Sequence, residues 1–202
     1  MLDKSANAGQ HSYEARGADC YQTPSCAVEA LLRVENVPHH VWEPACGPGA
    51  IVRVLRDHGH QVIASDLIDY GDPTHFYGRD FLMEKLPKGV EIICTNPPYQ
   101  LADAFVRHAI KICPLVIMLL RLAFLESVKR SDILDNAGLA RIHVAKERLP
   151  MMHRALWAGP RASSAIPFAW FCWSRGHQGP TTIDRFSWRN LPTSKDNGLA
   201  SS

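Results

Sequence analysis

The sequence has no apolar stretch long enough to cross a bilayer and no apolar leader at its start. Its longest apolar run, residues 115–125, is interrupted by Arg121, whereas a spanning helix needs about 20 apolar residues. Residues 1–10 are polar and lack the apolar core of a signal peptide. We therefore expect a cytoplasmic protein.

The chain also lacks internal repeats and low-complexity tracts. Hydrophobic residues make up 46% of its 202 residues and charged residues 21%, which is ordinary for an enzyme and excludes a disordered, collagenous or coiled-coil chain. This length predicts one domain, which we expect to span residues 20–189. Residues 1–19 and 190–202 are expected to be a flexible N-terminus and a flexible tail.

Spacing typical of metal ligands is absent as well. No two of the six cysteines are separated as C-x-x-C, and no His-x-His or His-x-x-x-His pair lies near them. We therefore expect no metal site and interpret the cysteines as reduced thiols. They lie at positions 20, 26, 46, 94, 113 and 172.

The small net charge of +2 conceals an asymmetry. Residues 1–120 hold 10 Lys/Arg against 14 Asp/Glu, and residues 121–202 hold 12 against 6. A basic part over residues 121–189 suits a polyanion such as nucleic acid, although chance clustering on a solvated face explains the charge equally well. Arg121 is either a buried anchor or a substrate contact, and His153 and Trp157 in the long loop either touch a substrate, pack in the core or are simply exposed. The candidate phosphate contacts are Arg130, Arg141, Lys146, Arg148, Arg154 and Arg161.

From residue 26 the apolar pattern alternates between helical and strand-like periods. It predicts strands at 40–43, 61–65, 90–95 and 115–120 and helices at 26–34, capped by Ser25, 50–57 and 102–112. Beyond Arg121 it predicts a helix at 124–135, a strand at 142–144, a long loop at 148–167 and strands at 168–173 and 182–188. Apolar strands alternating with amphipathic helices indicate an α/β fold, with a mostly parallel central sheet covered by helices on both faces. The last two strands are expected to form an antiparallel hairpin at the C-terminal edge.

The first candidate site is a glycine turn between a predicted strand and a predicted helix. Residues 41–50 read Val-Trp-Glu-Pro-Ala-Cys-Gly-Pro-Gly-Ala. Gly47 and Gly49 allow the backbone to approach a bound molecule, and the start of the helix directs free N–H groups to the same place. Because the third glycine of the dinucleotide fingerprint and the Gly-Lys-Ser/Thr of a phosphate loop are missing, we expect either a nucleotide-like cofactor of another kind or a plain turn.

Three acidic residues after the glycine turn are further candidates for binding the same molecule. Asp66 comes directly after the second strand, where a carboxylate can accept hydrogen bonds from both hydroxyls of a ribose. Asp69 competes for that role, and a helix cap or a solvated acid is the alternative. The pair Asp80-Phe81 can accept from the amine of an adenine and stack on its face.

The most specific motif is Asn96-Pro97-Pro98-Tyr99, directly after the third strand. The two prolines stiffen the turn. The carbonyl of Pro97 and the side-chain carbonyl of Asn96 are two acceptors for one planar –NH₂ group, and Tyr99 offers a stacking face. A structural Pro-Pro turn is the alternative, but the position at a strand end favours amine chemistry.

Together these motifs resemble the class I S-adenosylmethionine-dependent methyltransferases, and among them the amino-methyltransferases with an (Asp/Asn)-Pro-Pro-Tyr motif. The glycine turn precedes that motif, as in gamma-type adenine methyltransferases, and Tyr21-Gln22-Thr23-Pro24 resembles the N-terminal cofactor motif of that group. The segment over 169–173, Ala-Trp-Phe-Cys-Trp, is similar to small phage adenine methyltransferases. The resemblance covers roughly residues 21–120 and implies a Rossmann-like fold.

The resemblance implies S-adenosylmethionine as the cofactor, with roles for individual residues. The methionine part would be held by Tyr21, Thr23, Glu43, Pro44, Ala45, Cys46, Gly47 and Gly49. Asp66 would bind the ribose, and Asp80 and Phe81 the adenine. The target would be held by Asn96, Pro97, Pro98 and Tyr99, with Asn96 also bordering the cofactor.

The activity implied by the resemblance is methylation of the exocyclic amine of adenine in DNA. Methylation of adenine in RNA uses the same four residues and stays open. A protein glutamine methyltransferase ranks lower, since such enzymes carry a helical N-terminal domain and only about 20 residues precede Tyr21. A binding-only protein is the non-enzymatic alternative. No separate target-recognition domain is evident, and a monomer or a homodimer is expected.

Overall fold

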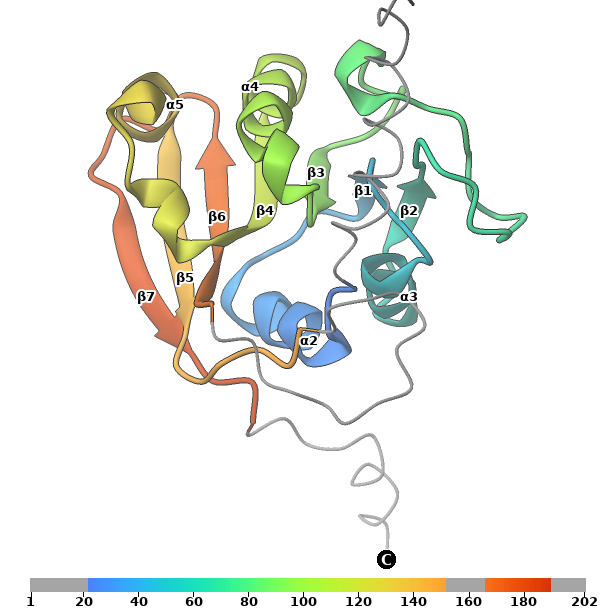
Figure 1. The fold of residues 1–202 in the computed structure, drawn as a ribbon, viewed down its shortest axis with the longest axis horizontal. Helices are drawn as coiled ribbons and strands as arrows, with labels where there is room; N and C mark the ends of the chain where they lie inside the picture. The colour runs from blue at the N-terminus through green and yellow to red at the C-terminus, as the bar shows by residue number, and fades with distance from the viewer. Residues whose placement is uncertain (1–21, 152–165, 190–202) are drawn as a thin grey trace, which may run out of the picture.

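The computed structural model describes residues 22–151 and 166–189 (Figure 1). Its helices are α2 (Ser25–Val34), α3 (Ala50–Asp57), α4 (Ala102–Ile112) and α5 (Ser131–Asp135). Its strands are β1 (His40–Glu43), β2 (Gln61–Ala64), β3 (Ile92–Thr95), β4 (Leu115–Arg121), β5 (Leu139–Ala145), β6 (Phe168–Ser174) and β7 (Thr182–Phe186). Single turns of 3₁₀-helix are η1 (Phe81–Met83), η2 (Tyr99–Leu101), η3 (Leu122–Leu125) and η4 (Val128–Arg130). None of the helices within these residues is long and apolar enough to span a membrane.

The seven strands form one sheet in the order β2-β1-β3-β4-β6-β5-β7. Every neighbouring pair is parallel except the two that involve β6, which runs antiparallel to β4 and to β5. The carboxyl ends of all the other strands and the amino end of β6 therefore lie at the same edge of the sheet. The predicted α/β class, with a mostly parallel sheet, is confirmed.

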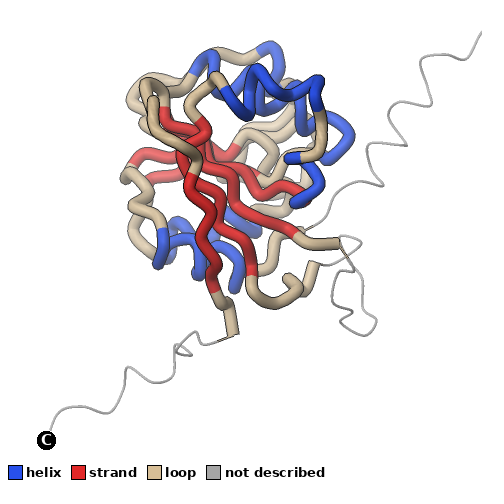
Figure 2. Tube along the Cα trace, turned by 90° about the vertical axis from the view of Figure 1, so that its left-hand side faces the viewer, coloured by secondary structure: helices blue, strands red, loops and turns tan. Residues whose placement is uncertain are grey.

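Helices cover both faces of the sheet (Figure 2). On one face α2 and α3 pack against a core that includes Leu31, Leu55 and Trp170. On the other face α4 and α5 pack against a second core that includes Phe105 and Phe171. Trp170 and Phe171 are consecutive residues of β6, so they point to opposite faces, as the pleat of a strand requires. Burial on both faces explains why the central strands are almost continuously apolar.

The helices α3 and α4 have the predicted bounds, and α2 begins one residue early. Ser25 was expected to cap α2, but it is the first helical residue, and Pro24 occupies the cap position without a side-chain bond. The predicted strands all exist; β1 has the predicted bounds, and one or both ends of each other strand differ from the prediction by one to three residues.

Two predictions for the region after β4 are wrong. The expected hairpin does not form, because β7 pairs in parallel with β5 and β6 lies between β4 and β5. The expected helix over 124–135 is broken into η3, η4 and the five-residue α5. Ser127 between η3 and η4 has an extended backbone, and Arg107 from α4 donates to the Lys129 carbonyl and pairs with Asp132. These contacts fix the chain in two short turns instead of a continuous helix.

Candidate active site

The ends of β1, β2 and β3 converge on one cavity of about 1090 Å³, counting the space at its mouth. Parallel strands place their carboxyl ends at the same edge, which is where open α/β sheets bind ligands. Thirteen of the predicted site residues line it, and they come from five separate segments: Thr23, Glu43, Pro44, Ala45, Cys46, Gly47, Asp66, Asp80, Phe81, Asn96, Pro97, Pro98 and Tyr99. Tyr21 lies outside the described residues.

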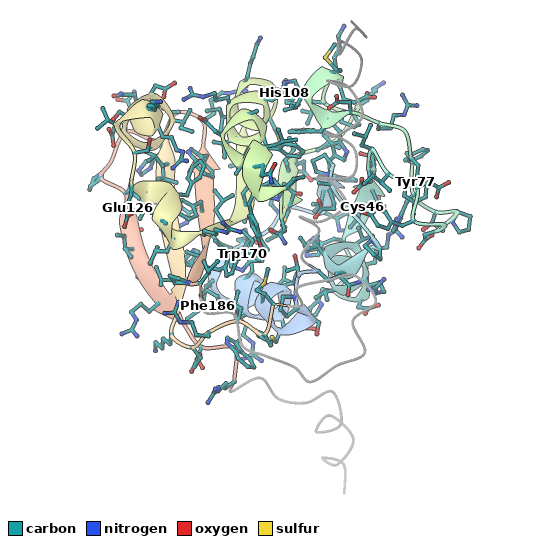
Figure 3. All side chains as sticks on the ribbon, in the orientation of Figure 1. Cys46, Tyr77, His108, Glu126, Trp170 and Phe186 are labelled. Carbon is teal, nitrogen blue, oxygen red and sulfur yellow. The ribbon has the colours of Figure 1, made fainter. Side chains whose placement is uncertain are left out.

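The glycine turn bends sharply between β1 and α3. Gly47 and Gly49 both have positive φ, 51° and 82°, a conformation in which a side chain is strained. The Gly49 N–H donates to the Cys46 carbonyl at 2.8 Å, and the Cys46 N–H donates to the Ser65 carbonyl at 3.0 Å. The turn is thereby fastened to β2, and Figure 3 shows Cys46 near the start of α3.

Gly49 does not line the cavity, but it packs closely against His75. A Cβ at this position would lie 2.7 Å from Cε1 of His75. The His75 side chain is almost completely buried, and its Nδ1 lies 3.6 Å from the Cys46 sulfur. Gly49 is therefore required for close packing of the glycine turn against the segment after β2.

Asp66 joins the glycine turn to the end of β2. Its Oδ2 accepts from the Gly47 N–H at 2.8 Å, and its Oδ1 accepts from the Ile68 N–H at 2.9 Å. Burial raises the pKa of Asp66, and these backbone donors oppose that rise. Each carboxylate oxygen has a further lone pair, so the residue can accept from a ligand hydroxyl while it orders both loops. Asp69 does not line the cavity; it accepts from the Gly71 N–H in an exposed turn.

Glu43 is the most deeply buried acid of the site, with 1% of its surface exposed. Its Oε1 accepts from the Ala45 N–H at 3.1 Å, whereas Oε2 makes no well-formed hydrogen bond within the described residues. Burial raises the pKa of Glu43 to about 8, with a further contribution from the nearby Asp66. A cation in the cavity would favour the ionised carboxylate.

Asp80 and Phe81 form another part of the wall. Asp80 caps η1 by accepting from the Leu82 N–H at 3.1 Å. The Phe81 ring is buried between Trp42 and Phe105, with ring centroids 5.3 and 4.8 Å away. The sequence predicted Phe81 to be a stacking platform, and the structure places it in an aromatic cluster with one border on the cavity.

The Asn96-Pro97-Pro98-Tyr99 motif follows β3 and passes into η2. The Asn96 side-chain nitrogen donates to the Thr23 hydroxyl at 3.0 Å. Because the nitrogen is bound there, the carbonyl Oδ1 is the end of the side chain that can accept. All four residues of the motif line the cavity.

Tyr99 lies between the cavity and two neighbours from other strands. The Arg121 guanidinium at the end of β4 lies over the Tyr99 ring, 4.5 Å from its centroid. The ring of Phe168, at the start of β6, has its centroid 5.5 Å from that of Tyr99. The sequence predicts Arg121 to be either a buried anchor or a substrate contact, and the structure places its guanidinium on the tyrosine of the Asn-Pro-Pro-Tyr motif.

Eleven further residues of the wall were not among the predicted site residues. Leu67, Ile68 and Tyr70 directly follow Asp66, so their position after a strand end is a usable signal. Pro48 and Ala50 lie in the glycine turn, and Gln22 and Arg79 are next to Thr23 and Asp80, whereas the rest are apolar residues without a distinctive pattern. The rest are Ile51, Leu82, Leu101 and Phe105.

The candidate phosphate contacts differ in their exposure and in their hydrogen-bond partners. Lys146 and Arg148 are exposed beyond the end of β5, at the same edge of the sheet as the cavity. Arg130 donates to the Phe124 carbonyl and lies over that ring. The Arg141 guanidinium is held in a two-point pair with Glu35. Arg154, Arg161, His153 and Trp157 lie outside the described residues.

Glu35, His143 and Cys172 form the one trio of side chains in the described residues with the spacing of metal ligands. His143 Nε2 lies 2.6 Å from Glu35 Oε1, but the same carboxylate is paired with Arg141. A guanidinium at this place repels a metal cation. We therefore interpret the group as a structural contact that connects the end of α2 to β5 and β6.

The cavity thus combines a glycine turn, buried acids and a motif of stiff acceptors at one edge of a parallel sheet. It can hold an elongated ligand with a cationic part near Glu43 and a hydroxyl-bearing part near Asp66. The acceptors of Asn96 and Pro97 border the same space, so a second molecule bound there can react with the first.

No protein-family model and no curated protein matches the sequence. Solved structures do match the fold. A protein of Listeria monocytogenes assigned to the class I S-adenosylmethionine-dependent methyltransferases is 12% identical, with a TM-score of 0.58 over 81% of this chain and 65% of that one. A protein of Pyrococcus horikoshii assigned as an RNA methyltransferase is 16% identical, with a TM-score of 0.58 over 78% of this chain and 88% of that one.

A third match is the modification subunit assigned to a type I restriction enzyme of Vibrio vulnificus. It is 15% identical, with a TM-score of 0.59 over 93% of this chain and 49% of that one. The chain therefore spans about two thirds of the Listeria protein and half of the Vibrio subunit. These similarities establish that it has the Rossmann-like fold of the class I S-adenosylmethionine-dependent methyltransferases.

Proposed function

We propose that this protein transfers a methyl group from S-adenosylmethionine to the exocyclic amine of adenine in DNA. The observation that supports the proposal most strongly is the placement of Asn96 and Pro97. They follow β3 at the wall of a cavity that also contains the glycine turn and Asp66. A structural turn has no need to combine these groups in one cavity.

The chain's own groups fit a cationic, ribose-bearing cofactor. Glu43 is a buried carboxylate whose Oε2 has only the loosely placed Thr95 hydroxyl beside it, and a cation there would favour its ionised form. Asp66 keeps acceptor capacity for ribose hydroxyls. Thr23 and the 43–49 turn would surround the methionine part, and Asp80 and Phe81 would border the adenine.

When bound, the cofactor supplies an electrophilic methyl group on a sulfonium. Asn96 Oδ1 and the Pro97 carbonyl accept the two hydrogens of the target amine, which favours a pyramidal nitrogen with its lone pair directed at the electrophile. Because the leaving sulfide would be neutral, no strong base is needed, and the methylated nitrogen would lose its extra proton to water. Positioning and the two acceptors therefore provide most of the catalysis.

Two features support a nucleic acid target: the basic part of the chain, residues 121–189, and the exposed cations at the sheet edge that holds the cavity. Lys146 and Arg148 are exposed at the edge where the cavity opens. In duplex DNA the target base has to be flipped out, at a cost of a few kcal/mol. Stacking on Tyr99 would offset about 1–3 kcal/mol of that cost.

Methylation of adenine in RNA is the second candidate. It is favoured by the similarity to the Pyrococcus protein, 88% of which is covered by this chain. The four residues of the motif would act in the same way, since the amine of adenine is the same in both nucleic acids. The phosphate contacts on the basic edge would also serve either one.

Transfer of radiolabelled methyl from S-adenosylmethionine tests the proposal. Unmethylated DNA, total tRNA and rRNA, and a release factor are offered in parallel, and labelled nucleic acid is digested to nucleosides. Label in methyldeoxyadenosine supports the proposed function. Label only in methyladenosine of RNA transfers the assignment to the second candidate, and label only in the release factor refutes both.

A further inference from the structure

Arg121 is placed where a target would stack. Its guanidinium, a planar cation, lies 4.5 Å from the centroid of the Tyr99 ring. Tyr99 belongs to the cavity wall, whereas Arg121 does not. The guanidinium therefore covers the tyrosine ring without belonging to the lining of the cavity.

The bonding of Arg121 differs from that of the other arginines around it. Arg107 and Arg141 are paired with carboxylates, and Arg130 donates to a carbonyl. The described residues give the Arg121 guanidinium neither a carboxylate nor a hydrogen-bond acceptor, and its Nε is buried. A buried N–H without an acceptor is unfavourable, so an anion beside Arg121 would satisfy a group that the protein leaves unsatisfied.

The surroundings of Tyr99 limit where a planar target can lie. The Phe168 ring already packs against Tyr99, with centroids 5.5 Å apart and planes at 38°. The guanidinium and a flat base both favour the face of an aromatic ring. A base that stacks on the face covered by Arg121 must first displace the guanidinium.

We propose that Arg121 occupies the target's place on Tyr99 and turns outward, when the base enters, to bind a phosphate group of the target nucleotide. The inference rests on the proposed function and names the part of the substrate that the chain recognises beside the base. A long, flexible arginine side chain can make this exchange without backbone movement, and its planar fork matches the oxygens of a phosphate.

If this exchange occurs, the variant Arg121→Ala should bind an oligonucleotide more weakly but should not bind adenosine more weakly. A single-stranded adenine-containing deoxyoligonucleotide loses a phosphate contact, so its affinity falls about tenfold. The slope of log affinity against log salt also becomes less steep by about 0.7, the value for one phosphate contact of a single strand. Adenosine has no phosphate and no longer competes with the guanidinium, so its affinity stays the same or rises.

The experiment uses the full chain. Fluorescence anisotropy of the labelled oligonucleotide is measured at several NaCl concentrations, and adenosine is measured by competition. Lys111→Ala is the matched control, because it removes a cation from the exposed end of α4, at the opposite edge of the sheet. It should leave both affinities unchanged. Binding of S-adenosylmethionine by each variant reports whether the fold is intact.

Arg121→Lys keeps the charge but lacks the planar group. This variant is used for the test if Arg121→Ala fails to fold. The lysine variant should retain the salt slope of the wild type. An unchanged slope and oligonucleotide affinity in Arg121→Ala, or a slope in Arg121→Lys that is less steep by about 0.7, would overturn the inference while leaving the proposed function in place. Equal losses for adenosine and oligonucleotide would make Arg121 a mere support for Tyr99. A wild type that binds neither ligand would refute the nucleic acid target itself.

Discussion

The side-chain nitrogen of Asn96 donates a 3.0 Å hydrogen bond to the hydroxyl of Thr23, 73 positions earlier in the chain. The bond joins the segment before α2 to the loop after β3. It also leaves the Oδ1 end of the Asn96 amide as the acceptor. Under the proposed function, orientation of the target amine therefore depends on Thr23.

Replacing Thr23 with valine should reduce turnover. Thr23 is 6% exposed, and valine removes the hydroxyl that accepts from the Asn96 nitrogen, a hydrogen bond worth about 1 kcal/mol. We expect kcat to fall at least tenfold, with Thr23→Ser close to wild type because the hydroxyl remains. Steady-state methylation assays of both variants check this, and a valine variant with wild-type kcat would show that the bond does not orient Asn96.

Glu43 should link cofactor binding to pH. Its pKa of about 8 in the cofactor-free protein means that it is protonated at neutral pH, whereas a bound cation favours the carboxylate. The affinity for S-adenosylmethionine should therefore rise from pH 6 to pH 9, with release of a proton near pH 7. Calorimetry in buffers of different ionisation enthalpy measures this release, and Glu43→Gln should abolish it. Binding without proton release in the wild type would contradict the account.

The same group should make unfolding depend on pH. The unfolded chain loses the Glu43 proton near pH 4.5, whereas the folded protein keeps it up to about pH 8. Because the native state binds the extra proton in this window, Glu43 should lower stability as the pH rises from 4.5 to 8. Urea unfolding of the wild type and of Glu43→Gln, compared at pH 5 and pH 8, isolates this contribution. The variant should lose less stability between the two pH values.

Gly49→Ala should be more harmful than a chemically identical change elsewhere. Gly59 has a similar φ, 87° against 82°, but a Cβ there would meet nothing within 4 Å. Both variants experience the backbone strain of about 1–2 kcal/mol, and only Gly49→Ala also collides with His75. Cofactor affinity should fall in Gly49→Ala and stay unchanged in Gly59→Ala. Equal losses of stability and affinity in the two would show that the contact with His75 is unimportant.

Glu35 should be a major contributor to stability. Its pairs with His143 and Arg141 outweigh burial and lower its pKa to about 2. The Arg141 side chain is 42% exposed, so the loss should be smaller than the ~3–5 kcal/mol of a fully buried ion pair, and Glu35→Gln should unfold at a lower urea concentration than the wild type at pH 7. Glu29→Gln, which breaks a half-exposed pair with His58, is the control and should change stability little.

The pH dependence of the Glu35 contribution has a defined sign. A carboxyl with a lowered pKa stabilises the fold above its unfolded pKa of about 4.5, and this contribution disappears as the pH falls toward 2. The difference in unfolding free energy between wild type and Glu35→Gln should therefore be largest at neutral pH and shrink below pH 4. A difference that stays constant down to pH 2 would show that charge is not its origin.

Much of the site could be predicted because its residues follow strands. Glu43, Asp66 and Asn96 each come directly after an apolar run, and parallel strands bring such positions to one edge. The glycines of the turn and the prolines of the motif are equally local signals. Helices with a clear apolar face, such as α3 and α4, were predicted with their observed bounds for the same reason.

The remainder depends on contacts between distant parts of the chain. Nothing local shows that β6 inserts between β4 and β5, because an apolar strand can pair with any other. The role of Arg141 is fixed by Glu35, 106 positions away, and that of Arg121 by Tyr99. Contacts of this kind depend on the tertiary packing of distant segments, which the local periodicity of the sequence does not encode.

The most direct test of the central claim is methyl transfer by Asn96→Ala, measured together with its affinity for S-adenosylmethionine. If the Asn96 carbonyl holds the target amine, transfer of label to adenine should fall by at least a hundredfold in kcat while the dissociation constant of the cofactor changes less than threefold, a loss typical of one key acceptor. A variant that methylates as fast as the wild type would contradict the proposed chemistry at this site.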